Sequence, residues 1–359
     1  MFTMSANPRP ASGPSLEQIL DHGRRIIQVA RAELDEARTR RNAIATALRA
    51  EFPGCRIYFN GSVAHGDALT PLTDVDLGVV IPNTDGTYGP GKRGPRDLKQ
   101  RTANAIRTAL EPTYGDLAVE VEGRKRSILI RFRDPVAPGR PDFTADVIVA
   151  IDNPHGAGLH IPRWDSWDRS HPERHTDLVL AAIETTDVAY ARIVRLLKHW
   201  ARCHDEPLCS WHIKALALGC ITEPTTLVAG LRTWFGYAAG RLAIEDTPDP
   251  ARVAAKPLKT NRPRTEVVRR LRDATERLER AIALENAGYD ALAQDELARL
   301  FNDEAMLPRP NQDLVTEQET VRVTAERAKD SKRLGAPSLV TGVGAGAAQL
   351  RPNVRSWAP

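Results

Sequence analysis

The sequence predicts an α+β fold, in which a mixed sheet with flanking helices is followed by a helical domain. Short β-rich segments separated by turn residues fill the first half of the 359-residue chain, up to about residue 151. From residue 170 onward, apolar residues recur at helical spacing instead. A chain of this length can form two domains with sizeable cores. We therefore expect a sheet-based domain over residues 15–165 and a helical domain over residues 166–310.

The two ends of the chain differ in composition from its middle. Residues 1–14 are rich in Pro, Ser and Gly, and residues 311–359 change from charged to Gly-, Ala- and Pro-rich sequence. Such segments have little apolar surface to bury. We expect a flexible leader at the N-terminus and a largely disordered C-terminal tail.

The overall composition is that of a soluble globular protein, with 42% hydrophobic and 27% charged residues. No apolar run reaches the length of a membrane span, and the N-terminus lacks the apolar core of a signal peptide. The four cysteines do not form a dense disulfide pattern, and the net charge of +4 does not by itself imply nucleic-acid binding. We expect a cytoplasmic protein that has no membrane partner.

The first predicted element is one long helix, or two helices in line, that ends near residue 50. Ser15 and Gln18 have the spacing of a capping box, and apolar residues then recur at helical intervals. The sequence Phe52-Pro53-Gly54 ends this segment before the first strand. We expect the helical segment to pack along both domains, because its apolar stripe is longer than one small sheet can cover.

Strands and helices then follow one another along the chain. Residues 122–126 are predicted to form the turn of a β-hairpin, and residues 83–95 a loop that lies over the functional site. The predicted strands cover residues 57–59, 75–81, 117–121, 127–132 and 142–151. The predicted helices cover residues 98–110, 187–204, 211–220 and 266–284, with a further helix beginning at residues 171–173.

Two carboxylates mark the start of the strand at residues 75–81. Asp74 and Asp76 lie two residues apart, so their side chains point to the same face. Adjacent carboxylates repel each other unless a cation neutralises them, and hard oxygen ligands suit Mg²⁺. Gly61 lets the backbone approach a ligand, and Ser62 offers a hydroxyl and an N–H to a phosphate oxygen. These residue types fit attack on a nucleoside triphosphate assisted by metal ions.

A third carboxylate completes the predicted acid cluster. Asp146 precedes the apolar sequence VIVAI, just as the first two acids open their own strand. Neighbouring strands would then bring the three acids together, and Asp146 would help to activate the incoming hydroxyl. Asp142 is the alternative candidate for the third acid. Either residue could also simply cap the end of a strand, without a catalytic role.

The pairing of Gly61-Ser62 with Asp74 and Asp76 resembles the signature of polymerase-β-like nucleotidyltransferases. The second half of the chain is similar to one branch, the bacterial CD-NTases, which are related to cyclic GMP–AMP synthase and oligoadenylate synthase. This resemblance covers about residues 15–310. It rests on the sequences HPERHTDLV, RIVRLLKHWARCHDEPLCSWHIKALAL and RAIALENAGYDALAQDELARLFNDEAMLP.

The resemblance implies a polymerase-β-like palm, a helical nucleotide-binding domain and a specific activity. Nucleoside triphosphates such as ATP would be condensed into a cyclic di- or trinucleotide, with two Mg²⁺ ions, or Mn²⁺, as cofactors. The product would activate a separate effector protein in bacterial anti-phage signalling, and a regulatory partner protein is compatible with this role. Lys198 and Ser210 would contact the triphosphate, which suits the charge of a lysine and a serine near a helix start.

Two other functions remain open on the sequence alone. The same chemistry could add nucleotides to RNA 3′ ends or to a protein. The other alternative is a non-enzymatic binding module whose active site is no longer functional, although the presence of all three acids argues against it. Three positions also depart from the usual pattern: His65 in place of Arg, Asp67 in place of Thr or Ser, and Asn302 in place of Gly.

Two further clusters bear on cofactors and partners. His199 and Cys203 lie one helical turn apart in a stretch that also holds His204, Cys209 and His212. This spacing matches no standard zinc motif, so we do not expect zinc. Residues 252–280 contain ten Lys/Arg and four Asp/Glu, and we interpret them as a solvated helical face. Whether this stretch or the basic residues 124–126 bind nucleic acid or a partner protein is left open.

Overall fold

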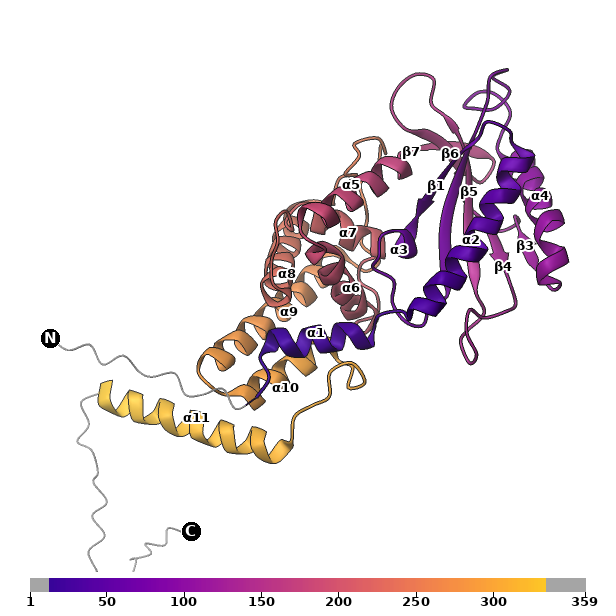
Figure 1. Ribbon diagram of the computed structural model, residues 1–359. Helices are drawn as coiled ribbons and strands as arrows, with labels where there is room; N and C mark the ends of the chain where they lie inside the picture. Colours follow the sequence, from indigo (N-terminus) through magenta and orange to yellow (C-terminus); the bar gives the residue numbers. More distant parts are fainter. Residues whose placement is uncertain (1–12, 334–359) are drawn as a thin grey trace, which may run out of the picture.

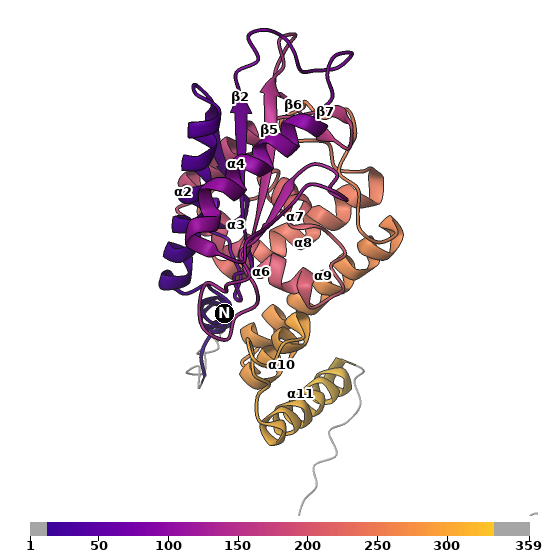
Figure 2. The same cartoon turned by 90° about the vertical axis from the view of Figure 1, so that its right-hand side faces the viewer.

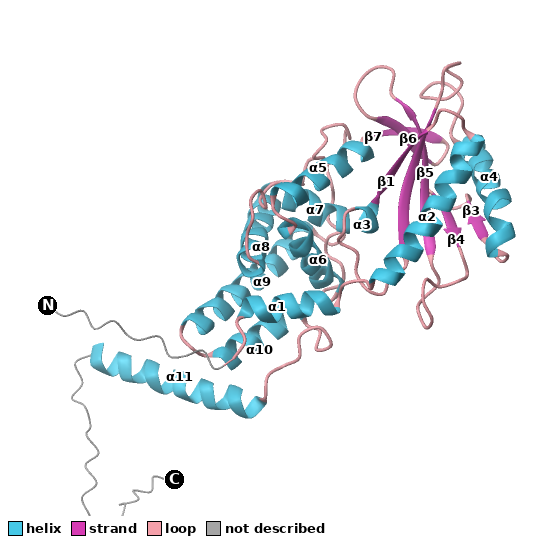
Figure 3. Ribbon diagram, in the orientation of Figure 1, coloured by secondary structure: helices cyan, strands magenta, loops and turns pink. Residues whose placement is uncertain are grey.

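The computed structural model describes residues 13–333. The strands gather in one lobe, and the helices from α5 onward gather in another, together with α1 (Figures 1 and 3). This arrangement confirms the predicted α+β fold with a helical domain after the sheet. The predicted leader lies almost entirely outside the described residues.

A seven-stranded mixed sheet forms the first lobe. Its order is β1-β2-β5-β4-β3, and β5 also pairs with β6, which in turn pairs with β7. Only β2 and β5 run parallel to each other, while the remaining pairs are antiparallel. The strands are β1 Arg56–Asn60, β2 Asp74–Ile81, β3 Ala118–Glu120, β4 Ile128–Arg131, β5 Thr144–Asp152, β6 Leu159–Arg163 and β7 Ser166–Ser170.

Helices flank the sheet and build the second lobe. Within residues 13–333 no helix is long and apolar enough to cross a membrane. The helices are α1 Leu16–Ile26, α2 Arg31–Glu51, α3 Gly61–Ala64, α4 Arg96–Tyr114, α5 Pro172–Thr185, α6 Ala189–Arg202, α7 Ser210–Leu218, α8 Leu227–Ile244, α9 Arg264–Asn286, α10 Asp290–Phe301 and α11 Gln312–Arg333.

The two faces of the sheet have different neighbours. Val75, Leu77 and Val79 of β2 are buried in one apolar cluster with residues of α2 and α4. Figure 2 shows these two helices against the sheet, on the side away from the helical lobe. Since side chains alternate along a strand, Asp74 and Asp76 point to the opposite face. The sheet therefore presents its acids toward the helical lobe.

The N-terminal helical segment consists of two helices that serve different lobes. The predicted boundary at residue 15 places both in the sheet-based domain, but Leu16 and Leu20 of α1 lie in the core of the helical lobe. The Glu17 carboxylate accepts hydrogen bonds from Leu227 N at 2.8 Å and from Val228 N at 2.9 Å. These two N–H groups have no partner inside α8, because they belong to its first turn. Glu17 thus caps a helix distant in sequence and joins α1 to the helical lobe.

This contact predicts a measurable loss of stability when Glu17 is replaced. Glu17→Ala should lower the free energy of unfolding by about 1–2 kcal/mol, because two helix N–H groups lose a charged acceptor. Denaturant unfolding followed by circular dichroism would measure the change. Glu317→Ala, at an exposed position of α11, is the control and should change stability by less than about 0.5 kcal/mol. Equal effects of the two substitutions would contradict the capping role.

Two details of the sheet-based lobe differ from the prediction. The hairpin of β6 and β7 pairs with β5, so this lobe extends to Ser170 rather than to residue 165. The loop at residues 83–95 follows Ile81, whereas the acids lie at the other end of β2. Gly89 of this loop lies beside Ile151, the partner of Ile81 in the sheet. The prediction that this loop covers the site is therefore wrong.

The C-terminal segment also departs from the prediction. Within the tail expected to be largely disordered, Gln312–Arg333 form α11. The side chain of Gln318 accepts hydrogen bonds from Ala291 N and Leu292 N, in the first turn of α10. The prediction of disorder is wrong for α11, whereas residues 334–359 lie outside the described part of the chain.

Candidate active site

Three carboxylates meet on the face of the sheet that points to the helical lobe. β2 and β5 are parallel, and their register pairs Asp76 with Asp146 and Asp74 with Thr144. Asp74, Asp76 and Asp146 therefore point to the same side of two adjacent strands, as the sequence predicts. Asp142 lies before β5 and is exposed, so the structure favours Asp146 over the alternative.

The acid cluster is electrostatically costly in the absence of a cation. Burial, together with repulsion from Asp74 and Asp146, raises the pKa of Asp76 to about 7. Burial and repulsion from Asp146 also raise the pKa of Asp74. Carboxylates that resist ionisation in this way favour a cation that neutralises several of them at once. The three side chains accordingly fit divalent cations with a preference for oxygen ligands.

Gly61 lies directly against Asp76. Its φ angle of +76° is in the left-handed region, and a Cβ built there would overlap Oδ2 of Asp76 and lie 2.7 Å from its Cγ. Only glycine fits this position, for both reasons. Ser62 follows in the short helix α3, and its backbone oxygen accepts a hydrogen bond from Asp67 N at 3.1 Å. This hydrogen bond closes the turn that follows Gly61.

Ser127 is a residue that the sequence does not single out. Its hydroxyl donates a hydrogen bond to Oδ1 of Asp146 at 2.6 Å. Ser127 directly precedes β4, which pairs with β5 on the side away from β2. This contact fixes the orientation of the Asp146 carboxylate through one of its two oxygens. The sequence signal was only a serine at the start of a predicted strand, which is too common to indicate a site.

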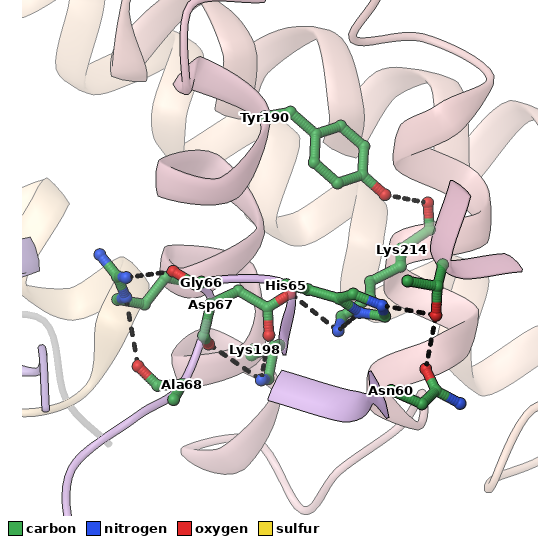
Figure 4. A network of polar contacts seen from close by, with 10 residues as sticks. Asn60, His65, Gly66, Asp67, Ala68, Tyr190, Lys198 and Lys214 are labelled. Carbon is green, nitrogen blue, oxygen red and sulfur yellow. Dashed lines mark hydrogen bonds and ion pairs between the residues drawn. The ribbon is translucent and has the colours of Figure 1, made fainter. Parts of the chain in front are cut away.

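Two lysines from the helical lobe share one buried aspartate (Figure 4). Nζ of Lys198, on α6, lies 2.7 Å from Oδ1 of Asp67, and Nζ of Lys214, on α7, lies 2.7 Å from Oδ2. Lys198 also donates to the backbone oxygen of Asp67 at 3.0 Å. Burial by itself would raise the pKa of Asp67, but the charges of Lys214 and Lys198 outweigh it and hold that pKa below its usual range. Asp67 is therefore ionised and bridges two cations.

His65 extends this network toward the glycine turn. Its Nδ1 lies 2.8 Å from Nζ of Lys214, and its Nε2 lies 3.3 Å from Oγ1 of Thr176. Burial and the charge of Lys214 lower the pKa of His65 to about 3, so the ring is neutral. An ammonium group only donates, so Nδ1 accepts and Nε2 carries the proton. The Thr176 hydroxyl in turn donates to the backbone oxygen of Phe59 and to Oδ1 of Asn60, each at 3.4 Å.

Arg195 completes the contacts between the two lobes around residues 65–68. Its guanidinium donates to the backbone oxygens of Gly66 and Ala68. The carbonyls of residues 66, 67 and 68 are thus all bound by cations from α6. His65 and Asp67, two of the three unusual positions in the sequence, hold the loop after Ser62 against the helical lobe.

The sequence matches no family model and no curated protein. Solved structures do match over most of the chain. Similar structures include CdnC of E. coli MS115-1 in its HORMA complex, with 18% identity, a TM-score of 0.60, and coverage of 79% of this chain and 96% of that one. CdnG of Bradyrhizobium diazoefficiens with GTP has 16% identity and a TM-score of 0.59. The match covers 83% of this chain and 98% of CdnG. The cyclic AMP-GMP synthase DncV of Vibrio cholerae has 15% identity and a TM-score of 0.52. The match covers 83% of this chain and 88% of DncV.

The chain has the fold of the bacterial CD-NTases. At these identities the comparison concerns the fold, and it confirms the predicted palm followed by a helical domain. The activity must be argued from the site itself.

Ser210 is the first residue of α7 in this CD-NTase fold. Cys209 is the N-cap residue, so Ser210 lies in the first turn of the helix, near its start as the sequence indicates. The Ser210 side chain is exposed, and Lys214 follows it by four residues on the same helical face. Ser210 therefore lies one turn from the lysine that contacts Asp67 and His65.

The His/Cys-rich stretch is divided among different environments. His204 packs on Trp200, His212 contacts Thr247, and Cys209 is exposed. His199 and Cys203 stay together: Nε2 of His199 lies 3.6 Å from Sγ of Cys203 and 2.9 Å from Oδ2 of Asp303. This group offers three donor atoms close together. The expectation that zinc is not a cofactor stays a prediction.

Half of the basic residues in the stretch 252–280 form surface ion pairs. Five of its ten basic residues pair with acids from the same helix or its neighbours. These residues are Arg264, Arg269, Arg270, Arg277 and Arg280. Such pairing is typical of a solvated helical face and agrees with that interpretation.

Proposed function

We propose that this protein is a Mg²⁺-dependent nucleotidyltransferase that condenses nucleoside triphosphates into a cyclic di- or trinucleotide and releases pyrophosphate. The observation that carries the proposal is the register of Asp76 with Asp146 on parallel neighbouring strands, with Asp74 beside them. Gly61 supports it further, since the backbone lies against Asp76 at the place where a nucleotide would bind.

The residues have separate roles in this reaction. A ribose hydroxyl of one nucleotide attacks the α-phosphorus of another, an O–P bond forms, and the bond to the pyrophosphate group breaks. Asp146, oriented by Ser127, accepts the hydroxyl proton. Asp74, Asp76 and Asp146 would hold two Mg²⁺ ions, or Mn²⁺, which neutralise charge on the attacking and leaving oxygens when bound. Ser62, Lys198 and Ser210 would bind the triphosphate, Ser62 through its hydroxyl and N–H.

Metal binding at this site should depend on pH. Because burial raises the pKa of Asp76 to about 7, protons compete with the cation below that value. We expect the affinity for Mg²⁺ to be about tenfold weaker at pH 6 than at pH 8, since one proton must leave. Calorimetric titration of the nucleotide-free protein would measure it, with proton release detected by varying the buffer. An affinity that is equal at both pH values would contradict the assignment.

The partners implied by this function are nucleoside triphosphates and a separate effector that responds to the cyclic product. A regulatory protein is also supported, since CdnC, one of the similar structures, was solved in a complex with HORMA. A role in anti-phage signalling in the cytoplasm belongs to the same proposal.

An acceptor other than a nucleotide is the second candidate function. Lys125, on the turn after β3, and the five basic residues of 252–280 outside the ion pairs described above provide positive surface for RNA. Arg124 and Arg126 of the same turn pair with Glu120 and Asp168. The acid cluster would perform the same transfer on an RNA 3′ end or on a protein.

One experiment separates these functions. The purified protein is incubated with labelled NTPs and Mg²⁺, with and without RNA. Small labelled products that resist phosphatase are the expected result. Labelled RNA, or labelled protein, would favour the second candidate. A protein that neither binds nor converts any NTP would contradict both.

A further inference from the structure

Asp67 occupies an unusual place for a carboxylate. It is completely buried, and its two oxygens each lie 2.7 Å from a lysine ammonium group that belongs to the helical lobe. Asp67 follows Gly61, which lies against Asp76, by six residues. The charges of the two lysines oppose the rise in the pKa of Asp76 that burial and the neighbouring carboxylates cause. One buried aspartate thus holds the two cations that a triphosphate at this site would meet.

The two lysines differ in how firmly they are held. Lys214 is 3% exposed, contacts both Asp67 and Nδ1 of His65, and its backbone oxygen accepts a hydrogen bond from the hydroxyl of Tyr190 at 2.9 Å (Figure 4). Lys198 is 9% exposed, and both of its hydrogen bonds go to Asp67. Lys198 can therefore exchange its partner at a smaller cost than Lys214 can.

We propose that Asp67 is a positioning residue that acts as a resident counter-ion for Lys198 until a nucleotide binds. The triphosphate then takes Lys198 from Asp67, while Lys214 and His65 keep Asp67 and its loop in place. This inference rests on the proposed function, and it assigns to Asp67 and Lys214 roles that the sequence does not indicate.

The charges of the cluster support the exchange. Lys198 and Lys214 carry two positive charges, and Asp67 carries a single negative charge. His65 adds none, because its ring is neutral. One positive charge is therefore in excess before a nucleotide arrives. A triphosphate brings further negative charge to the site, and hydrogen bonds between charged groups are stronger than neutral ones. Asp67 competes for Lys198 in the free protein and prevents two buried ammonium groups from repelling each other.

The test is the effect of Asp67→Asn on binding and on turnover separately. Removing the competing charge should lower both the Kd for inorganic tripolyphosphate with Mg²⁺ and the KM for the NTP by about three- to tenfold. The same change should lower kcat by about tenfold or more, because the loop after Ser62 loses its anchor. A residue with only a structural role would instead leave KM unchanged or raise it. Unchanged or weaker binding of tripolyphosphate would overturn the proposal.

A second variant keeps the test usable if the single substitution destabilises the fold. The double variant Asp67→Asn with Lys214→Met removes both members of the buried pair, which is tolerated better than removing one. It leaves Lys198 without its resident anion, so tripolyphosphate should again bind more tightly than to the wild type. Weaker or equal binding would overturn the exchange.

A matched control and the wild type complete the design. Glu33→Gln weakens the ion pair between the buried Glu33 and the partly exposed Arg140 in the sheet-based lobe, and should lower the melting temperature without changing the Kd for tripolyphosphate. If the wild type converts NTPs but Asp67→Asn shows no tighter binding, only this inference fails. If the wild type binds neither tripolyphosphate nor NTP, the proposed function fails.

Discussion

Asp76→Asn should reduce nucleotide transfer by about a thousandfold or more while the protein stays folded. Asp76 lies between Asp74 and the paired Asp146, so the substitution removes the central negative charge at almost constant volume. Loss of metal-assisted charge stabilisation of about 4 kcal/mol corresponds to about a thousandfold in rate. Steady-state release of pyrophosphate with Mg²⁺ and NTP would measure the effect.

The same substitution should make the metal-free protein more stable at alkaline pH. The pKa of Asp76 is raised to about 7 in the folded protein, above its unfolded value near 4. For such a group, native stability is lost as the pH rises toward and through the folded pKa. At pH 8 without metal, Asp76→Asn should therefore melt at a higher temperature than the wild type, and the difference should shrink at pH 5.

Asp142→Asn is the matched control, since Asp142 is exposed just before β5. It should keep both the wild-type rate and the wild-type pH dependence of melting. Near-wild-type turnover of Asp76→Asn, or loss of activity in Asp142→Asn, would show that the acids are wrongly assigned.

The sequence predicts the acid cluster well because the physical rules behind it are local. Side-chain alternation places Asp74 and Asp76 on one face, and the apolar sequence after Asp146 marks a strand of the same kind. What the sequence does not state is that β2 and β5 run parallel and adjacent, which puts Asp76 opposite Asp146. The resemblance to polymerase-β-like enzymes supplies that step, and the structure agrees with it.

Other features escape prediction because they depend on contacts between distant segments. The sequence marks Asp67 only as a departure from the usual pattern, and only the folded chain brings Lys198 and Lys214 to it. Helix α8 has apolar residues around its whole circumference, so it gives no clear one-sided pattern. The mostly polar composition of α11 predicts a disordered tail. Its contact with the rest of the protein, in which Gln318 caps α10, is not visible in the sequence.

The positions of α1 and of the Asp67 network indicate how the lobes are joined. α1 packs in the helical core and α2 in the sheet-based core, so the chain itself crosses between the lobes. The second connection is formed by Lys198, Lys214 and Arg195 of the helical lobe, which hold residues 65–68. A nucleotide bound at the acids would touch the sheet and the helical lobe at once. We expect its binding to stabilise the folded protein as one unit.

Gly61→Ala should abolish nucleotide transfer by displacing Asp76. The new methyl group would overlap the carboxylate of Asp76, and the φ angle of +76° adds a backbone cost of about 1–2 kcal/mol for any residue with a Cβ. A shift of about 1 Å in a catalytic group is enough to reduce a rate about a hundredfold, and here both Asp76 and the phosphate-binding turn would move. We expect the rate to fall at least that far.

Gly66→Ala separates the two causes, because Gly66 shares the left-handed backbone but has open space where a Cβ would lie. Its φ angle is +66°, and among residues 13–333 no atom would lie within 4 Å of that Cβ. Both variants should lose about 1–2 kcal/mol of stability, because alanine is disfavoured in the left-handed backbone conformation. Denaturant unfolding would measure this loss. Only Gly61→Ala should also lose Mg²⁺ affinity and turnover, because only its methyl group reaches a carboxylate. Equal activity of the two variants would mean that Asp76 can move without consequence, and that the acids do not form the catalytic centre.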